Sequence, residues 1–309
     1  MRAHRDWLDR LAHRTPTVPL EDPATGCTLW LKLEYTLPSG STKDRVATAI
    51  LTDAVSRGVV GPSTTVVEAS SGSTSIALAM ACAVLGLRFV AVMPAAVSNE
   101  RVLLIRRYGA DVVLTDAGDG MLGALEAAEK TAADDPSVFL CRQFENPLNV
   151  QAHRVGTGPE LLLQMDGPLH GFVAGVGTGG TLMGVGAALR EAGEPTRIAQ
   201  VRPTHGAPFT GQPEVCGGIP GIVEGFSTLL DPAAIDADDD IIVPDVEAVE
   251  TARELCALGL AVGPSSGLNV AGARELARRL GPGHNVATVL CDRMERYFST
   301  SLFDDLRSS

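Results

Sequence analysis

The feature that most constrains the fold is a repeated alternation of short β-branched runs with longer segments of helical pattern. In the first half, strands are expected at 64–69, 88–94, 111–116 and 137–143, with helices at 46–58, 75–86, 98–109 and 121–135. The second half repeats the alternation, with strands expected at 171–177, 197–203, 241–244 and 285–291 and helices at 181–193, 244–259 and 269–281. Alternating strands and helices joined by short turns predict an α/β fold in which parallel sheets are covered by helices on both faces.

The two runs of alternation divide the chain near Asn146 and Pro147. A length of 309 residues is sufficient for two domains, each with a core of its own. We therefore expect two open, twisted sheets with an active-site cleft between them. The predicted smaller α/β domain spans residues 38–146, and the predicted larger domain combines residues 1–37 with 147–309 and carries the phosphate loop described below.

Composition and charge argue against several classes of function. A formal net charge of −12 argues against a nucleic acid partner, because phosphate backbones require clustered Lys and Arg. The N-terminus lacks the apolar core of a signal peptide, and no apolar run reaches the ~18 residues that span a bilayer. The six cysteines lie far apart, without a CxxC pair or a zinc-like Cys/His spacing. We expect a cytoplasmic protein with reduced thiols, no metal site and no membrane contact.

Three turns rich in Gly, Ser and Thr lie at or near the ends of predicted strands, where ligands bind in parallel sheets: ASSGST (69–74), GVGTGGT (175–181) and GPSSG (263–267). The glycines of GVGTGGT allow a ligand to approach the backbone closely, and successive N–H groups at a helix start suit a phosphate. This loop is neither a Walker A motif nor GxGxxG, and a plain turn is the alternative. The hydroxyls and N–H groups of ASSGST suit a carboxylate, with an ordinary N-cap as the alternative.

A fourth loop, PSGSTKDR (38–45), carries a lysine at an unusual position. The helical run that follows places Lys43 in the first turn, where the positive end of the helix dipole disfavours a cation. The ordinary explanation is a lysine on the surface. Burial at this position would instead lower the pKa of the amine, as a nucleophilic lysine requires. A reactive lysine, a phosphate cradle and a carboxylate cradle together describe a site for pyridoxal phosphate and an amino acid.

Taken together, the motifs resemble the cysteine synthase (O-acetylserine sulfhydrylase) family, which belongs with cystathionine β-synthase to the fold-type II pyridoxal phosphate enzymes. The matching motifs run in the same order from about residue 15 to residue 303: PSGSTKDR, SSGST, QFENPLN, TGPEL, GVGTGGTLMG, GPSSG and ERYFSTSLF. The resemblance implies a tryptophan synthase β-like fold, pyridoxal 5′-phosphate as cofactor, an amino-acid substrate and a homodimer. Members of this family can bind the C-terminal tail of serine acetyltransferase in the active-site cleft, so this tail is a candidate partner.

The resemblance also implies roles at matching positions. Lys43 would form the imine with the cofactor and act as the base at the substrate Cα, and Ser265 would face the pyridine nitrogen. A neutral serine there leaves the ring nitrogen largely unprotonated, which favours loss of a β-substituent over transamination. The cofactor would also be bound by the following residues: Ser73, Gly177, Thr178, Gly179, Gly180 and Thr181. The substrate would be bound by a second set: Ser70, Ser71, Gly72, Thr74 and Gln143.

Three departures from the family pattern leave the exact substrate open. The usual TSGNTG reads SSGSTS, so Ser73 replaces the asparagine that contacts the cofactor 3′-oxygen and Ser75 replaces a glycine. The segment CDRMERY (291–297) stands where the family usually has a turn rich in Gly and Ser. His205 lies in a segment expected to approach the active site, and a polar loop residue outside the chemistry is the alternative. SSGST also occurs in relatives that degrade cysteine.

The leading hypothesis is β-replacement on an activated L-serine (O-acetyl- or O-phosphoserine) by sulfide, which gives L-cysteine through an α-aminoacrylate. One alternative is net β-elimination, as in a cysteine desulfhydrase or a serine/threonine dehydratase. Another is β-replacement with a different nucleophile in a specialised pathway. Two hypotheses from other classes are a non-catalytic partner-binding protein on the same scaffold and a phosphate-binding α/β module that uses no pyridoxal.

Overall fold

The computed structural model describes residues 8, 10, 14–204, 219–222, 225, 227–231, 233 and 240–307. Its strands are β1 (Thr17–Asp22), β2 (Cys27–Lys32), β3 (Thr65–Ala69), β4 (Arg88–Pro94), β5 (Asp111–Thr115), β6 (Val138–Leu140), β7 (Gly171–Gly175), β8 (Arg197–Pro203), β9 (Asp240–Val243) and β10 (Asn285–Val289). Its helices are α2 (Lys43–Ser56), α3 (Ser73–Leu85), α4 (Asn99–Arg107), α5 (Gly120–Asp134), α6 (Pro147–Ala152), α7 (Gly158–Gln164), α8 (Gly180–Glu191), α9 (Asp245–Ala257), α10 (Pro264–Leu280) and α11 (Asp304–Arg307).

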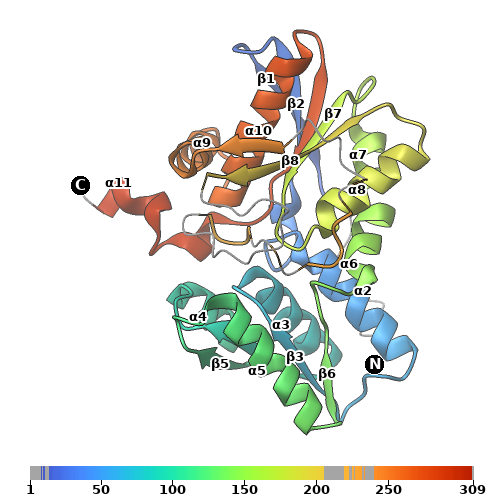
Figure 1. The fold of residues 1–309 in the computed structure, drawn as a ribbon, viewed down its shortest axis with the longest axis vertical. Coiled ribbons are helices and arrows are strands. Elements are labelled where there is room, and N and C mark those ends of the chain that lie inside the picture. Colours follow the sequence, from blue (N-terminus) through green and yellow to red (C-terminus); the bar gives the residue numbers. More distant parts are fainter. Residues whose placement is uncertain are drawn as a thin grey trace.

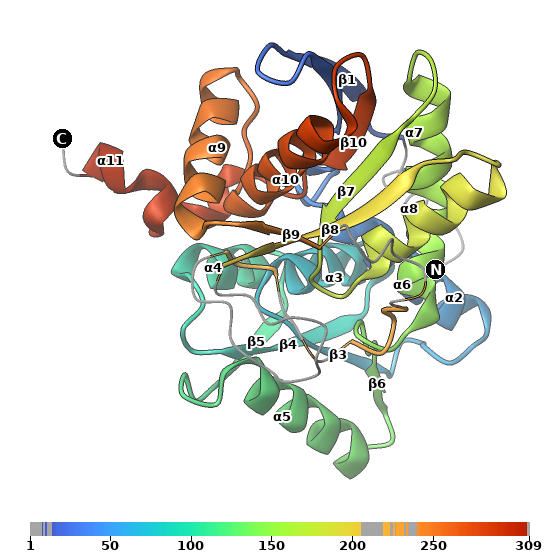
Figure 2. The same cartoon turned by 45° about the horizontal axis from the view of Figure 1, so that its top comes forward.

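The strands form two sheets, which lie in the upper and lower parts of the molecule in Figure 1. The larger sheet has the order β1-β2-β10-β7-β8-β9, and the smaller has the order β5-β4-β3-β6. Every pairing except that of β1 with β2 is parallel. In Figure 2 the smaller sheet lies between α3 and α4 on one side and α5 on the other. The predicted α/β fold class is therefore confirmed.

The N-terminal hairpin departs from the expected parallel pattern. β1 and β2 pair antiparallel, with Thr17 opposite Lys32, and β2 then pairs parallel with β10 from the other end of the chain. The sequence TVPLED gave no clear strand signal, because it contains Pro19 and two acidic residues. Proline is tolerated on an edge strand, which is where β1 lies. The larger sheet therefore includes residues 17–32, and the domain limits at 38 and 146 stay a prediction.

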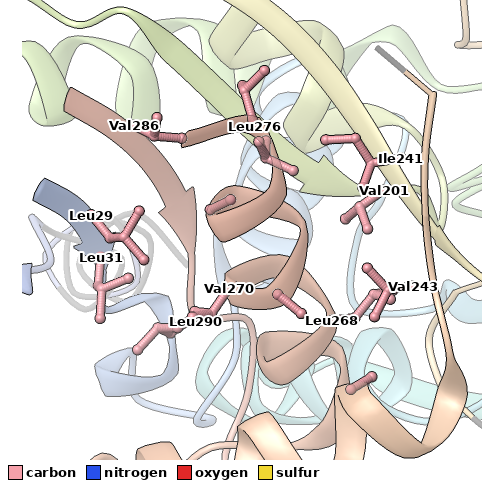
Figure 3. Packing of buried hydrophobic residues seen from close by; sticks show 14 of the residues in the cluster. Leu29, Leu31, Val201, Ile241, Val243, Leu268, Val270, Leu276, Val286 and Leu290 are labelled. Carbon is pink, nitrogen blue, oxygen red and sulfur yellow. The ribbon is translucent and has the colours of Figure 1, made fainter. Parts of the chain in front are cut away.

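Each sheet buries its own apolar layer. In the larger sheet, α10 places Leu268 and Leu276 among the side chains of β2, β8, β9 and β10, as Figure 3 shows. In the smaller sheet, α2 and α3 cover one face and α5 covers the other. Full burial of one Val, Leu, Ile or Phe side chain contributes ~1.5–3 kcal/mol. These layers fix the strand ends on which the loops of the candidate site lie.

A buried ionic network holds α2 in place. Arg45 donates to Glu34 from Nε at 2.6 Å and from Nη2 at 2.7 Å, and to Glu160 from Nη1 at 2.8 Å and from Nη2 at 2.7 Å. Lys32 reaches Glu160 at 3.0 Å and donates to the carbonyl of Thr15 at 2.6 Å. Because both cations are paired, their burial does not leave an isolated charge. Arg45, two residues after Lys43, therefore connects α2 to α7 through Glu160, and Lys32 connects β2 to the same glutamate.

Candidate active site

Four helices begin around one pocket. The first residues of α2, α3, α8 and α10 contribute Lys43, Ser73, Gly180 and Ser265 to its lining. In none of the four does the side chain of the capping residue accept a hydrogen bond from the first turn. The positive ends of the four helix dipoles favour an anion at such a place.

The site consists of two adjoining pockets. The glycine pocket is lined by residues 41–43, 73, 174, 175, 177–181, 220–222, 265, 269, 291 and 292. The hydroxyl pocket is lined by residues 43, 70–74, 101, 121, 143, 144, 177, 178, 221 and 297. Both linings share residues 43, 73, 177, 178 and 221. A ligand with a phosphate at one end and a polar group at the other could occupy both.

Lys43 lies where the two pockets meet. It is the first residue of α2 and is half-buried. Burial lowers the pKa of its amine, and the neighbouring Cys291 and Asp292 partly oppose this shift. A lowered pKa leaves more of the amine uncharged at neutral pH, so that it can act as a nucleophile or accept a proton.

The loop that begins α8 depends on glycine at several positions. A Cβ on Gly177 would collide with the carbonyl oxygen of Gly221, and one on Gly180 would collide with the side chain of Asn149. Gly179 has φ of +81°, a left-handed conformation that an L side chain rarely adopts. The backbone is thus packed closely against Gly221 and Asn149, and glycine is required at these positions.

Side chains behind this loop hold its hydroxyls. Asn149 Nδ2 donates to Thr178 Oγ1 at 2.8 Å and to the carbonyl of Gln143 at 2.8 Å. His153, which is fully buried, lies with Nδ1 at 2.9 Å from Thr157 Oγ1 and Nε2 at 3.3 Å from Thr181 Oγ1. Burial lowers the pKa of His153 well below its usual range, and Arg45 and Lys43 add to the shift. The imidazole is therefore neutral and orients the hydroxyl of Thr181.

The hydroxyl loop at the start of α3 is braced internally. Ser70 Oγ accepts from the N–H groups of Gly72 and Ser75, each at 3.2 Å, and lies 2.6 Å from Ser75 Oγ. Thr74 Oγ1 donates to Gln143 Oε1 at 2.6 Å, and Gln143 Nε2 donates to the Ala69 carbonyl at 2.8 Å. The hydroxyl of Ser70 thus shapes the loop, and Ser75, in place of the family's glycine, takes part in this bracing.

A buried carboxyl group lies beneath the hydroxyl loop. Glu68 accepts from the N–H of Ala69 at 3.0 Å and from the N–H of Gln143 at 3.2 Å. Burial raises the pKa of Glu68 to about 8, although these two hydrogen bonds oppose the shift. Arg142, which precedes Gln143, has a φ of +54°, a left-handed conformation that is uncommon for residues other than glycine. Glu68 therefore joins the two segments that carry the hydroxyl loop and Gln143.

Two of the three departures from the family pattern, Ser73 and the CDRMERY segment, meet at the boundary of the pockets. Ser73 Oγ donates to Asp292 Oδ2 at 2.9 Å, and the hydroxyl of Tyr297 donates to the same oxygen at 2.7 Å. Asp292 is 5% exposed. The serine that replaces asparagine is therefore hydrogen-bonded to an acid from the unusual CDRMERY segment.

The structure brings together all the residues that the sequence singled out for the site. Each of them lines the glycine pocket, the hydroxyl pocket or both. The GPSSG motif is the first turn of α10, which begins at Pro264 and not at 269 as expected, because proline is well tolerated at a helix start. His205 lies outside the described residues. Sequence reasoning assigned no role to the side chains from distant segments: Glu68, Arg101, Asn149, His153, Asp292 and Tyr297. The matched motifs QFENPLN and ERYFSTSLF contain Asn149 and Tyr297, and the unusual CDRMERY segment contains Asp292 and Tyr297.

Within the described part of the chain, no three His, Cys, Asp or Glu side chains are grouped so that they could hold a metal ion. The described helices include none with the length and apolar character needed to cross a bilayer.

Comparison with known proteins adds to this geometry. The family model for "Pyridoxal-phosphate dependent enzyme" matches residues 8–292. Cysteine synthase B of Campylobacter jejuni is 41% identical over 308 residues, which cover 98% of this chain and 100% of that protein. Among solved structures, an O-ureido-L-serine synthase has a TM-score of 0.89 at 39% identity, over 96% of this chain and 94% of that one. A hydrogen sulfide-producing enzyme from Fusobacterium nucleatum has a TM-score of 0.91 at 33% identity, over 98% and 92%.

The family match extends over both sheets and over nearly all of the motifs that line the two pockets. A lysine between a phosphate-type loop and a hydroxyl loop is also the arrangement that this cofactor requires. The chain therefore belongs to the family of pyridoxal-phosphate dependent enzymes and uses pyridoxal phosphate as its cofactor.

Proposed function

We propose that this enzyme performs β-replacement on an activated L-serine, with sulfide as the nucleophile and L-cysteine as the product. The observation that carries the proposal is the joint placement of Lys43, the glycine loop and the hydroxyl loop in a chain 41% identical to a cysteine synthase. The activating group is an acetyl or a phosphoryl group on the serine hydroxyl, because hydroxide itself leaves poorly.

The residues of the glycine pocket fit the cofactor. Gly177, Gly179 and Gly180 leave a concave backbone that a Cβ would disrupt, at the uncapped start of α8. We assign the phosphate to this loop and to the hydroxyls of Thr178 and Thr181, since N–H groups and a helix dipole stabilise a dianion. Ser265, also in this pocket, would face the ring nitrogen.

Lys43 would serve both binding and proton transfer. When bound, pyridoxal phosphate supplies an aldehyde that condenses with amines and a ring that stabilises negative charge on the adjacent carbon. The amine of Lys43 would hold the aldehyde before the substrate amine replaces it. It would then be free to remove the proton from the substrate Cα, and its lowered pKa suits this task.

The hydroxyl pocket would hold the substrate. Ser71 and the N–H groups at the start of α3 would take the α-carboxylate, and Thr74 and Gln143, which are bound to each other, would fix the shape of this cradle. Ser73 takes the place of an asparagine expected at the cofactor 3′-oxygen. Because its hydroxyl donates to Asp292, we assign it to the pocket boundary instead.

The choice of nucleophile has a specific competitor. A solved neighbour at 39% identity is an O-ureido-L-serine synthase, which makes a serine derivative by forming a bond to oxygen rather than sulfur. Another neighbour, at 33% identity, is a hydrogen sulfide-producing enzyme. β-Replacement with an oxygen nucleophile and net β-elimination are therefore the alternatives to test.

The test supplies one activated serine with different partners. O-Acetyl-L-serine is incubated with the purified holoenzyme alone, with sulfide or with hydroxyurea, and cysteine, O-ureido-L-serine and pyruvate are quantified. Faster release of cysteine than of the other two products supports the proposal. Dominant O-ureido-L-serine or dominant pyruvate would assign the alternative reaction. O-Phospho-L-serine in parallel identifies the leaving group.

Two expectations about assembly stay predictions. A homodimer would be detected by light scattering at several concentrations. Binding of a serine acetyltransferase tail would be detected with a synthetic C-terminal peptide that competes with O-acetyl-L-serine. The non-catalytic alternative predicts binding of such a peptide with no turnover of any activated serine.

A further inference from the structure

Arg101 is a buried arginine that has no acidic partner among the residues that the structure describes. It is 5% exposed, its Nε has no hydrogen-bond partner, and no described acid lies within ion-pair distance of its guanidinium. Two other deeply buried arginines have partners for their terminal nitrogens, although Nε of Arg296 is also unpartnered. Arg45 is bound to two glutamates, and Arg296 donates to the carbonyl oxygens of Gly40 and Ser39.

The position of Arg101 is set by two neighbours. Its guanidinium carbon lies 4.9 Å from the centre of the Tyr297 ring, a cation–π distance. Its side chain also packs on Gly72, where an added Cβ would lie 2.8 Å from Nε and still closer to Cδ. Gly72 thus has a steric reason to be glycine, in addition to its φ of +150°. The guanidinium is held against the hydroxyl loop by contacts that leave its charge unneutralised.

Apart from Tyr297, the ionisable side chains that line the hydroxyl pocket are all basic. Its lining contains Arg101 and Lys43 but no aspartate or glutamate. Asp292, which lies at the boundary, accepts from Ser73 and Tyr297 through Oδ2, its buried Oδ1 has no hydrogen-bond partner, and it forms no ion pair with Arg101. A guanidinium removed from water without an anion is costly, and a buried charge is usually paired. The pocket is therefore electrostatically incomplete until it takes up a negatively charged group.

We propose that Arg101 is a substrate-binding residue whose guanidinium pairs with a carboxylate of the bound amino acid. The proposal rests on the proposed function only in taking the ligand to be an amino acid. A carboxylate matches the planar fork of a guanidinium and can accept two parallel hydrogen bonds. Two sources of this chemistry are open: the α-carboxylate, held jointly with the start of α3, or a second carboxylate on the substrate side chain or nucleophile.

The test measures which ligand charge is coupled to Arg101. The holoenzyme is titrated with L-alanine, L-alaninamide and L-aspartate, which differ in the number of carboxylates, and binding is followed by calorimetry and by cofactor absorbance. The variants are Arg101→Gln and Arg101→Lys. Arg106→Gln is the matched control, because Arg106 lies on the same helix α4 and is exposed.

If the α-carboxylate is the partner, Arg101→Gln weakens binding of L-alanine by ~10–100-fold and of L-alaninamide by less than ~3-fold. If a second carboxylate is the partner, only L-aspartate loses affinity by this factor. Arg106→Gln should change none of the three affinities. An equal loss for acid and amide, or no loss for any ligand, would overturn the proposal and leave Arg101 as a support for Tyr297.

A second variant covers a failure to fold. If Arg101→Gln loses its thermal transition or its cofactor, the same titrations are made with Arg101→Lys. Lysine keeps the positive charge but lacks the planar guanidinium that can donate two parallel hydrogen bonds to a carboxylate. A loss of ~5-fold or more for a carboxylate ligand with the amide unchanged supports the proposal. Unchanged affinities overturn it. These measurements need no turnover, so failure of the proposed reaction with activated serines is distinguishable from failure of this assignment.

Discussion

The two pockets of the active site are built in different ways. The glycine pocket is formed largely by backbone: Gly177, Gly179 and Gly180 leave no room for side chains, and Asn149 and His153 hold the hydroxyls of Thr178 and Thr181. The hydroxyl pocket is formed by side chains from segments far apart in the chain, including Arg101, Gln143 and Tyr297. Backbone cradles tolerate little change, whereas side-chain linings can be altered one residue at a time. We infer that the cofactor half of the site is fixed and that substrate choice resides in the other half.

Lys43 belongs to both pockets, and its replacement tests whether they act as one site. We expect Lys43→Ala to lower turnover by at least ~10³-fold, because the chain loses both the amine that holds the cofactor and the base at Cα. Absorbance at ~410 nm, typical of pyridoxal phosphate joined to a lysine, should disappear. Lys130→Ala is the control, as Lys130 is exposed on α5. A variant that kept its turnover would separate the two pockets and remove the basis of the mechanism.

The glycine pocket should be the less tolerant half. A Cβ at Gly180 would collide with the buried side chain of Asn149, so Gly180→Ala must displace Asn149 from Thr178. We expect a loss of ~1–3 kcal/mol in the free energy of unfolding and a ~10-fold or greater loss of cofactor affinity. Chemical denaturation and reconstitution of the cofactor-free protein measure the two effects.

Gly186→Ala in the same helix is the matched control. Its Cβ would lie 3.5 Å from the nearest atom outside the helix backbone, an ordinary contact. Alanine is the better helix former by up to ~1 kcal/mol, so stability should stay equal or rise. Equal effects of the two substitutions would contradict the view that this pocket is fixed by backbone packing.

The contrast between a pocket formed by continuous backbone and one formed by side chains from distant segments also explains which site residues the sequence could predict. The glycine and hydroxyl loops are continuous segments, so the residues of each lie close together whatever the details of the fold, and their chemistry could be read directly. The alternation of strands and helices placed both loops at strand ends. Arg101 lies on α4 and Tyr297 near the C-terminus, and no local pattern indicates that they meet. Such contacts depend on how the helices and the C-terminal segment pack around the pocket.

The sequence also predicted some elements of the fold better than others. The parallel core followed from strand and helix periodicity, but the β1–β2 hairpin did not, because its edge strand contains a proline and charged residues. The predicted helix begins at 269, whereas α10 begins at Pro264 and includes Ser265, Ser266 and Gly267, which are weak helix formers. Packing stabilises the helical conformation of these three residues, because they are buried against neighbouring elements. A Cβ on Gly267 would collide with α9. Tertiary packing therefore overrides local propensity at both places.

A pH experiment tests the bracing behind the glycine pocket. The folded-state pKa of His153 is lowered by burial, so below about 6.5, the usual histidine pKa, the unfolded chain binds a proton that the folded chain does not. Stability should therefore fall with decreasing pH below about 6.5, by at most ~1.4 kcal/mol per pH unit from this residue.

His153→Gln should remove that contribution and flatten the acid side of the profile. The comparison is made by urea unfolding of the wild type and the variant between pH 5 and pH 8, at constant ionic strength. His284→Gln serves as a control, because His284 is only partly buried and lies away from the pockets. Parallel profiles for the wild type and His153→Gln would show that another group controls the acid sensitivity.

The smallest expected effect concerns the boundary between the pockets, where Ser73 donates to Asp292. If this pair shapes the substrate half, Ser73→Ala and Asp292→Asn should each change KM for O-acetyl-L-serine by several-fold while cofactor affinity changes by less than ~2-fold. A charge-assisted hydrogen bond contributes about 1.5–3 kcal/mol. The loss on removing the Ser73 hydroxyl should be smaller, because Tyr297 still donates to the carboxylate of Asp292. The double variant should therefore show a coupling of about 1 kcal/mol between the two positions. Additive effects would mean that the two departures from the family pattern act independently, and an effect mainly on cofactor affinity would assign Ser73 to the fixed half of the site.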